Sequence, residues 1–351
     1  MAALSERSGP LVGRAFVHPT FDYLLVGGGL SLLVTATVIM VPRTAGLLDS
    51  VTLPYFILFS NSAHFAASTV RLYTKPDART SRPFVTMGLP LVTLLLMSVC
   101  IFRAARLGPS LQALYLTWSP YHYAAQAYGL AVMYCYRSGC QLSGREKNTL
   151  WSISMIPFLY AFLTGSGVGI DWVLPQNVLN QPLTDDIRRI SSHVLAVLAF
   201  LTPLLLFIRV WRSHGRPLPI ISLLVLFSNG IWWLVLSSLD AFAWATIFHG
   251  IQYLAIVIIF HVKDHMVRDG NTHGAFYHIL WFYGACLMLG YSLFNVLPLA
   301  YRFAGFGRVE SVMLVVATIN IHHFIVDGYI WRLKKADSNR RVVDSGTQAA
   351  V

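Results

Sequence analysis

Long apolar segments separated by short polar ones dominate the chain. With about 20 residues as the length that crosses a bilayer, ten segments qualify: 21–42, 50–71, 84–102, 109–136, 148–165, 190–209, 219–238, 241–261, 275–297 and 309–331. The connections are short except 166–189, which contains glycines, prolines and the Asp185–Asp186 pair, and we expect it to cap one end of the bundle. The pattern predicts an all-α fold, a polytopic integral membrane helix bundle of about ten transmembrane helices in a single domain over 1–335.

Composition indicates the same class. Hydrophobic residues make up 56% of the 351 residues and charged ones 12%, with a mean hydropathy of +0.59, whereas a soluble protein carries about 25% charged residues. The four cysteines show no CxxC spacing, and three lie in apolar runs, which favours packing over a disulfide or zinc framework. The segment 336–351 is polar and rich in small residues, which predicts a disordered cytoplasmic tail.

The net charge of +11 has two interpretations. Nucleic-acid binding would need a basic helix with interleaved aromatic residues, and the sequence has none. Most of the 26 Lys and Arg residues instead fall at the N-terminus, after the even-numbered segments and at the C-terminus, as the positive-inside bias requires of ten spans with both termini in the cytoplasm. The first twenty residues lack the apolar core of a signal peptide. We therefore expect a multi-pass protein of a bacterial inner membrane, with the lipid bilayer and no nucleic acid as its partner.

Five of the twelve histidines lie near the middle of apolar segments. They are His64 in the second segment, His122 in the fourth, His249 in the eighth, and His322 and His323 in the tenth. Ionisable side chains at that depth cost roughly 2.5 kcal/mol or more each. Even-numbered segments run in one direction, so the five imidazoles share a slab roughly 10 Å thick. Helix bundles build metal sites from inward-facing side chains in this way, and we predict all five as metal ligands, although an isolated membrane histidine also serves as an interhelical hydrogen bonder.

Polar residues one turn from these histidines are candidates for supporting roles. Asp327 follows His323 by four residues and is predicted to ligate the metal or to orient that ring. Gln126 and Gln252, one turn after His122 and His249, are predicted to hold ring tautomers from the second shell of ligands. Tyr253, or alternatively Tyr128, is predicted to deliver a proton or an electron.

A second set consists of His261, His265, His273 and His278. His261 and His265 have the i,i+4 spacing of a two-histidine metal clamp and are predicted as ligands. Charged neighbours such as Lys263 and Arg268 show that this part of the chain touches water, where histidines need no metal, and both interpretations stay open. His249 and His261 lie about 18 Å apart on a helix, so the two sets cannot share one metal. His18, His193 and His214 are expected outside the site.

Partial resemblances to known families follow from these spacings. His261 and His265 resemble the HxxxH box of histidine-rich membrane desaturases and hydroxylases, and His322–His323 resembles half of their HxxHH box, which implies a di-iron centre; the chain has no complete HxxHH. The His–His pair is also similar to that of haem–copper oxidases. A further set is similar in residue type, but not in order, to membrane zinc amidohydrolases related to ceramidases: Ser60, His64, His322, His323 and Asp327.

These residues predict a histidine-rich membrane metalloenzyme. Neutral imidazole suits iron, copper and zinc, and an added carboxylate favours iron, manganese or zinc. We expect a non-haem iron oxidoreductase, with one or two iron ions, that acts on a lipid or another hydrophobic small-molecule substrate and takes electrons from a donor protein; Asp327 and Tyr253 are its predicted catalytic residues. Three alternatives stay open: a haem-binding redox protein, a zinc-dependent intramembrane hydrolase, and a proton or metal-ion transporter. Zinc, copper and haem therefore remain candidate cofactors.

Overall fold

The regular secondary structure of the chain is helical wherever it is described. The computed structural model describes residues 11–41, 52–75, 80, 82–215, 217–235, 238–331 and 338–344, and within these ranges it contains no strand. The predicted all-α fold is therefore confirmed. The chain folds into two compact units: unit 1 comprises Met1–Ala45, Thr117–Gln252 and Arg340–Val351, and unit 2 comprises Gly46–Leu116 and Tyr253–Asn339.

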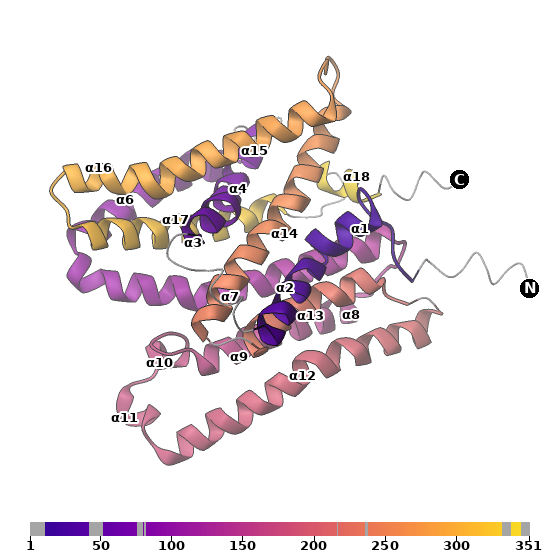
Figure 1. Cartoon of the computed structure of the whole chain (residues 1–351), viewed down its shortest axis with the longest axis horizontal. Coiled ribbons are helices and arrows are strands. Elements are labelled where there is room, and N and C mark those ends of the chain that lie inside the picture. Colours follow the sequence, from indigo (N-terminus) through magenta and orange to yellow (C-terminus); the bar gives the residue numbers. More distant parts are fainter. Residues whose placement is uncertain are drawn as a thin grey trace, which may run out of the picture. The chain divides into compact units, whose positions relative to one another are not determined.

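Unit 1 is built around the longest helices of the chain (Figure 1). Its elements are α1 (Pro19–Phe21), η2 (Asp22–Val26), α2 (Gly29–Met40), the second half of α7 (Ala104–Arg137), α8 (Gly144–Ser154), α9 (Ile156–Thr164), α10 (Ile170–Val173), α11 (Gln176–Leu179), α12 (Pro182–His214), α13 (Ile220–Val235) and the first half of α14 (Ser238–Met266). Helix α12 packs against α9 and α13, and α13 packs against α2. The buried carboxylate of Asp22 anchors the N-terminal segment by accepting hydrogen bonds from the Phe16 N–H at 2.6 Å and the Tyr134 hydroxyl at 2.7 Å.

Unit 2 is built around α4 and α17, which pack against each other. Its elements are α3 (Leu53–Phe56), η4 (Ile57–Ser62), α4 (Ala63–Thr74), η5 (Phe84–Gly88), α6 (Leu89–Phe102), α15 (Ala275–Tyr291), η6 (Ser292–Val296), α16 (Leu297–Phe303) and α17 (Arg308–Ile330), with the remaining parts of α7 and α14. Helix α15 lies against α4, and α17 lies against both α4 and α6 (Figure 1). A Cβ on Gly290 would stand 2.6 Å from the carbonyl oxygen of Ser62. The missing side chain at Gly290 therefore lets α15 approach the turn that leads into α4.

The last described segment, α18 (Ser338–Asp344), falls within the predicted tail 336–351. Residues 336, 337 and 345–351 of that tail lie outside the described residues. The prediction of a single transmembrane domain over 1–335 stays a prediction.

Five helices in the described ranges are long and apolar enough to cross a membrane. They are Phe84–Phe102, Pro182–His214, Phe242–Met266, Ala275–Phe303 and Arg308–Ile330. The pair Pro19–Val26 and Gly29–Met40, bent by 57°, would make a sixth if it forms one span. These helices are consistent with the predicted multi-pass membrane class, but the expected number of about ten spans is not confirmed.

Five predicted segments are not among these candidate spans. One of them, 109–136, lies within the single helix α7, and the other four fall short for separate physical reasons. The first is bent at Gly28, whose φ of +86° is a left-handed conformation. The second, helical over 53–74, carries polar residues such as Asn61 and His64 in its middle. The fifth is divided at Met155, just before Pro157, and the seventh, α13, has only 16 residues. Counting apolar residues along the sequence does not reveal the bend at Gly28 or the break at Met155.

The outer face of α12 is what a lipid-contacting helix requires. Only 22% of its most apolar 18-residue stretch is buried inside the protein. Large apolar side chains spaced three or four residues apart are exposed along it: Leu183, Ile187, Ile190, Val194, Val197, Leu201, Leu205 and Ile208. In water such a stripe would be a large exposed apolar patch, whereas in hydrocarbon it is solvated.

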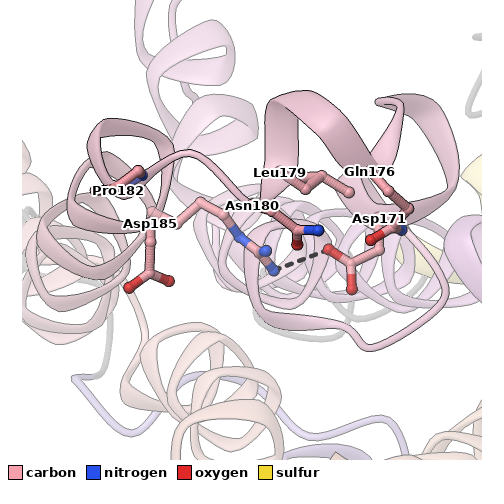
Figure 2. A pocket seen from close by; sticks show the side chains of 7 residues that line it. Asp171, Gln176, Leu179, Asn180, Pro182 and Asp185 are labelled. Atoms are coloured by element: carbon pink, nitrogen blue, oxygen red, sulfur yellow. Dashed lines mark ion pairs between the residues drawn. The ribbon is translucent and has the colours of Figure 1, made fainter.

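The long connection 166–189 folds into α10, α11 and the start of α12. It surrounds a polar pocket of 430 Å³ (Figure 2), lined by Asp171, Gln176, Leu179, Asn180, Pro182, Asp185 and Arg188. Arg188 pairs with Asp171 at 3.0 Å and also donates to the carbonyl oxygen of Leu163 at 2.9 Å. The connection is therefore held closed by its own ion pair. Its predicted role as a cap on the bundle stays a prediction.

Candidate metal centre

Unit 2 brings together His64, His323 and Asp327, hereafter the Asp327 cluster. His64 lies on α4, and the other two lie one turn apart on α17. All three side chains are buried, and a potential ligand atom from each lies within 4.8 Å of those of the others. His323 Nε2 is 3.3 Å from Asp327 Oδ2, and the rings of His64 and His323 have centroids 4.4 Å apart. Two imidazoles and one carboxylate thus converge in a group that could hold a metal ion.

Ser68 orients the His323 ring. Its Oγ lies 2.8 Å from His323 Nδ1, and its hydroxyl also donates to the Phe65 carbonyl at 3.2 Å. A serine hydroxyl has a single hydrogen, so a hydroxyl that donates to Phe65 accepts from Nδ1–H of His323. Nε2 of the neutral ring then presents a lone pair to the Asp327 carboxylate. Two acceptors facing each other in a buried place require a proton or a cation between them.

Tyr253 holds the other oxygen of the carboxylate. Its hydroxyl donates to Asp327 Oδ1 at 2.5 Å and accepts from Trp331 Nε1 at 3.2 Å. The Tyr253 ring also packs edge-on against His64, with centroids 4.5 Å apart. The structure therefore brings together the two residues predicted as catalytic, Asp327 and Tyr253. Sequence reasoning missed Trp331.

His322 turns away from the Asp327 cluster. Its Nδ1 lies 2.8 Å from the Thr93 hydroxyl on α6. Consecutive residues of an α-helix point about 100° apart, so His322 faces α6 while His323 faces α4. His322 is not among the residues whose potential ligand atoms lie within 4.8 Å of one another, and its predicted role as a ligand stays a prediction.

Unit 1 pairs His122 of α7 with His249 of α14. Both are buried, and their ring centroids are 5.0 Å apart. Gln126 donates to the backbone carbonyl of His249 at 3.4 Å, and Gln252 donates to that of Val26 at 3.1 Å. The two glutamines thus bind main chain instead of the imidazoles they were expected to orient. Tyr128, the alternative to Tyr253, packs edge-on against Trp151 with centroids 5.2 Å apart. That His122 and His249 share a metal with the histidines of unit 2 stays a prediction.

A second histidine group, the α14–α15 cluster, consists of His261, His265 and His278. Potential ligand atoms of the three lie within 4.8 Å of one another, all inside unit 2. His273, the fourth member of the set singled out in the sequence, is exposed and stacks on Tyr277. His18, His193 and His214 lie outside both clusters, as expected, and His214 pairs with Glu146 at 2.7 Å.

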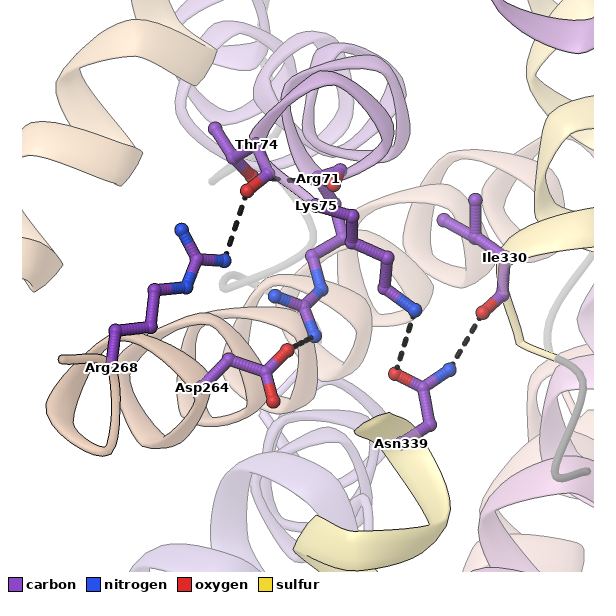
Figure 3. A network of polar contacts seen from close by, with 7 residues as sticks. All are labelled: Arg71, Thr74, Lys75, Asp264, Arg268, Ile330 and Asn339. Carbon is purple, nitrogen blue, oxygen red and sulfur yellow. Dashed lines mark hydrogen bonds and ion pairs between the residues drawn. The ribbon is translucent and has the colours of Figure 1, made fainter. Parts of the chain in front are cut away.

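A polar network ties α4 to the end of α14 next to this cluster (Figure 3). Buried Arg71 forms an ion pair with Asp264, and Arg268 donates to the Thr74 carbonyl at 3.0 Å. Burial lowers the pKa of the Arg268 guanidinium. Asn339 extends the network by accepting from Lys75 at 3.2 Å and donating to the Ile330 carbonyl at 2.6 Å. These contacts fix the helix that carries His64 against the helix that carries His261 and His265.

Comparison of the chain with protein-family models, curated proteins and solved structures finds no match. Function is therefore inferred from the geometry of the two clusters in unit 2.

Three supporting residues have partners that the sequence did not indicate. Ser68 is one turn from His64 in the sequence, but it serves His323. Thr93, which bonds His322, stands far from the histidine motifs, whereas Asn271, which bonds His278, lies within the 261–278 stretch, in the connection between α14 and α15. Spacing finds partners on the same helix, whereas partners on another helix appear only after packing is known.

Proposed function

We propose that this protein is an integral-membrane metalloenzyme, a non-haem iron oxidoreductase that acts on a hydrophobic substrate. The metal ligands in this proposal are His64, His323 and Asp327. The observation that carries it is the convergence of two buried imidazoles and one buried carboxylate within 4.8 Å. This donor set is the one that non-haem iron(II) oxygenases use, with coordination positions left open for substrate or dioxygen.

The charge balance of the Asp327 cluster supports a bound cation. A carboxylate buried among apolar helices is costly unless it is paired. A divalent ion would offset its charge and fill the space between His323 Nε2 and the carboxylate. Ser68 and Tyr253 occupy the positions from which a neighbouring side chain fixes a ligating ring and a ligating carboxylate.

In this proposal the chain's residues prepare the site for oxidation of a C–H bond. Bound iron would supply the one-electron and dioxygen chemistry. One oxygen atom of dioxygen enters the substrate and the other leaves as water, with two electrons from a donor protein and two protons. Tyr253 holds a proton at its hydroxyl against Asp327, with Trp331 as its hydrogen-bond donor, and the buried setting keeps bulk water out.

The surroundings of the Asp327 cluster favour an apolar substrate that enters from the membrane. His323 and Asp327 lie on one candidate span, Arg308–Ile330, and Tyr253, which donates to Asp327, lies on another, Phe242–Met266. The Phe65 ring packs against the rings of His323 and Phe294, with centroid separations of 4.8 Å and 5.7 Å. Phe294 lies on η6 and is partly exposed, next to exposed apolar residues such as Val296. The proposal places the protein in a bacterial inner membrane with both termini in the cytoplasm, on the distribution of Lys and Arg.

The test is anaerobic loading of the detergent-purified protein with Fe²⁺, followed by iron analysis and electron paramagnetic resonance of the nitric oxide adduct. We expect the wild type to bind iron at the Asp327 cluster and to give the half-integer-spin signal of a non-haem iron nitrosyl. His323→Ala should lose that signal, whereas His322→Ala, a change of the same size at the neighbouring position, should keep it. An unchanged signal in His323→Ala, a haem Soret band, or exclusive retention of zinc would overturn the proposal.

A further inference from the structure

We infer that His261, His265 and His278 form a second metal site, chemically distinct from the Asp327 cluster, for a divalent cation that prefers imidazole ligands, such as zinc. The inference is independent of the proposed oxidoreductase function. Ring centroids are 4.2 Å apart for His261 and His265, 5.0 Å for His265 and His278, and 6.2 Å for His261 and His278. Three imidazoles from two helices therefore surround one point.

Local sequence explains how the three rings meet. His261 and His265 are four residues apart and lie on one face of the last turns of α14. The chain then reverses through residues 267–274, where Gly270 adopts a φ of +77°. Helix α15 begins at Ala275, and His278 projects from its first turn. The reversal brings the start of α15 back to the end of α14.

Asn271, in the reversal, fixes which nitrogen of His278 is free to bind a metal. Its Nδ2 donates to the His273 carbonyl at 3.0 Å and its Oδ1 accepts from the His273 N–H at 3.3 Å, which identifies the amide oxygen. That oxygen lies 2.9 Å from His278 Nε2. An amide oxygen only accepts, so Nε2 carries the proton, and the lone pair of the neutral ring is on Nδ1. A ligating histidine is usually held in this way, through its other nitrogen by an oxygen.

His261 supplies a second, independent indication of a ligand. The side chain is 0% exposed, and neither of its ring nitrogens has a hydrogen-bond partner. Nε2 of His265 is also buried without a partner. Buried polar groups in proteins are normally satisfied, and coordination of a cation would provide a partner for one of the two ring nitrogens of His261.

The donor set selects the class of cation. It comprises three imidazoles and no carboxylate. Asp264, the carboxylate between His261 and His265 on α14, forms an ion pair with Arg71 instead (Figure 3). Three histidines with a fourth position open to solvent are a common zinc arrangement, and imidazole also suits copper and nickel. His265 is partly exposed, which gives an ion a path from water. The Asp327 cluster differs because a carboxylate is one of its ligands.

The test is titration of the metal-stripped full-length protein in detergent with Co²⁺, which reports four-coordinate sites by intense visible absorption. We use His323→Ala as the background, so that the Asp327 cluster does not contribute. In this background we expect one Co²⁺ per chain with such a band. Adding His278→Ala or His265→Ala should abolish it, whereas adding His273→Ala, a nearby exposed histidine, should leave it intact. Retention of the band and the stoichiometry in the His278→Ala protein would overturn the inference.

Asn271 gives a second test that leaves all three imidazoles in place. Asn271→Leu removes the acceptor for His278 Nε2–H and should weaken Co²⁺ binding by roughly 10- to 100-fold. Asn271→Asp retains an acceptor oxygen and should restore the affinity. Equal affinities of the Leu variant and the wild type would contradict the assigned tautomer. Failure of the Asp327 cluster to bind metal would leave the expected Co²⁺ results at His261, His265 and His278 unchanged. The experiments can therefore refute either proposal without refuting the other.

Discussion

Removal of the Ser68 hydroxyl tests whether His323 is a metal ligand held in place by its neighbour. Ser68→Ala deletes one oxygen, 2.8 Å from His323 Nδ1. Ser68 is 0% exposed, so bulk water does not reach the vacated position. The His323 ring then loses the partner that fixes its tautomer and its orientation toward Asp327.

Two magnitudes separate the structural effect from the effect on the metal. A hydrogen bond between membrane helices averages about 0.6 kcal/mol in double-mutant cycles, so the thermal midpoint should fall only slightly. Loss of the partner that orients a ligating histidine typically weakens metal affinity by about 10- to 100-fold. That factor corresponds to about 1.4–2.7 kcal/mol of binding free energy, well above the structural effect.

Thr93→Val is the matched control. Thr93 also places a hydroxyl 2.8 Å from an imidazole Nδ1, but that imidazole is His322, outside the Asp327 cluster. Both variants should lose similar stability, and only Ser68→Ala should lose metal affinity, measured by competition for Fe²⁺ with a chelator of known affinity. Equal metal affinities in the two variants would refute the assignment of His323 as a ligand.

Three further predictions concern the frame that holds the clusters. Gly290→Ala should destabilise the protein by roughly 1–3 kcal/mol, because its Cβ would stand 2.6 Å from the Ser62 carbonyl oxygen. The control, Gly284→Ala on the same helix, meets nothing within 4 Å and should be neutral or stabilising. Thermal unfolding in detergent compares the two variants, and equal midpoints would contradict the close approach of α15. Asp264→Asn leaves Arg71 buried without its counter-charge and should cost about 3–5 kcal/mol, whereas Asp186→Asn in an exposed pair with Arg189 should change the midpoint little; similar losses would show that burial does not matter to the first pair. Partial burial is the largest single influence on the pKa of Glu146 and raises it, but hydrogen bonds from Ser143 and pairing with His214 together lower the pKa below its ordinary value. A lowered pKa means that the contribution is complete above the pKa of the unfolded chain and is lost as the pH falls through the folded value, so the midpoint difference between the wild type and Glu146→Gln should shrink below about pH 4; a constant difference would argue against the contribution of these contacts.

The all-α fold class could be predicted from the sequence, because long apolar segments indicate helices that cross a lipid bilayer. The predicted number of about ten spans is not confirmed, because a run of apolar residues does not disclose a bend at Gly28 or a break at Met155. These interruptions depend on backbone conformation and on packing against other helices. The helices are where the pattern placed them, but only some are long and apolar enough to span.

The candidate site was predictable as far as depth and helical spacing determine it. Helical spacing places His323 and Asp327 on one face of α17, because they are four residues apart. The position of a residue along its apolar segment indicates the level at which Tyr253 on α14 meets them. The rotation of each helix about its own axis is set by packing, and this is why His322 binds Thr93 while its neighbour faces His64. Gln252 illustrates the same limit: it has the right spacing from His249 but bonds the Val26 carbonyl.

The most direct test of the proposed centre is a cryo-electron microscopy or anomalous-scattering map of the iron-loaded protein. We predict metal density at bonding distance from one nitrogen of His64, from His323 Nε2 and from an Asp327 oxygen. A map in which His323 and Asp327 contact each other directly with no metal between them, at saturating Fe²⁺, would contradict the assignment of these residues as iron ligands.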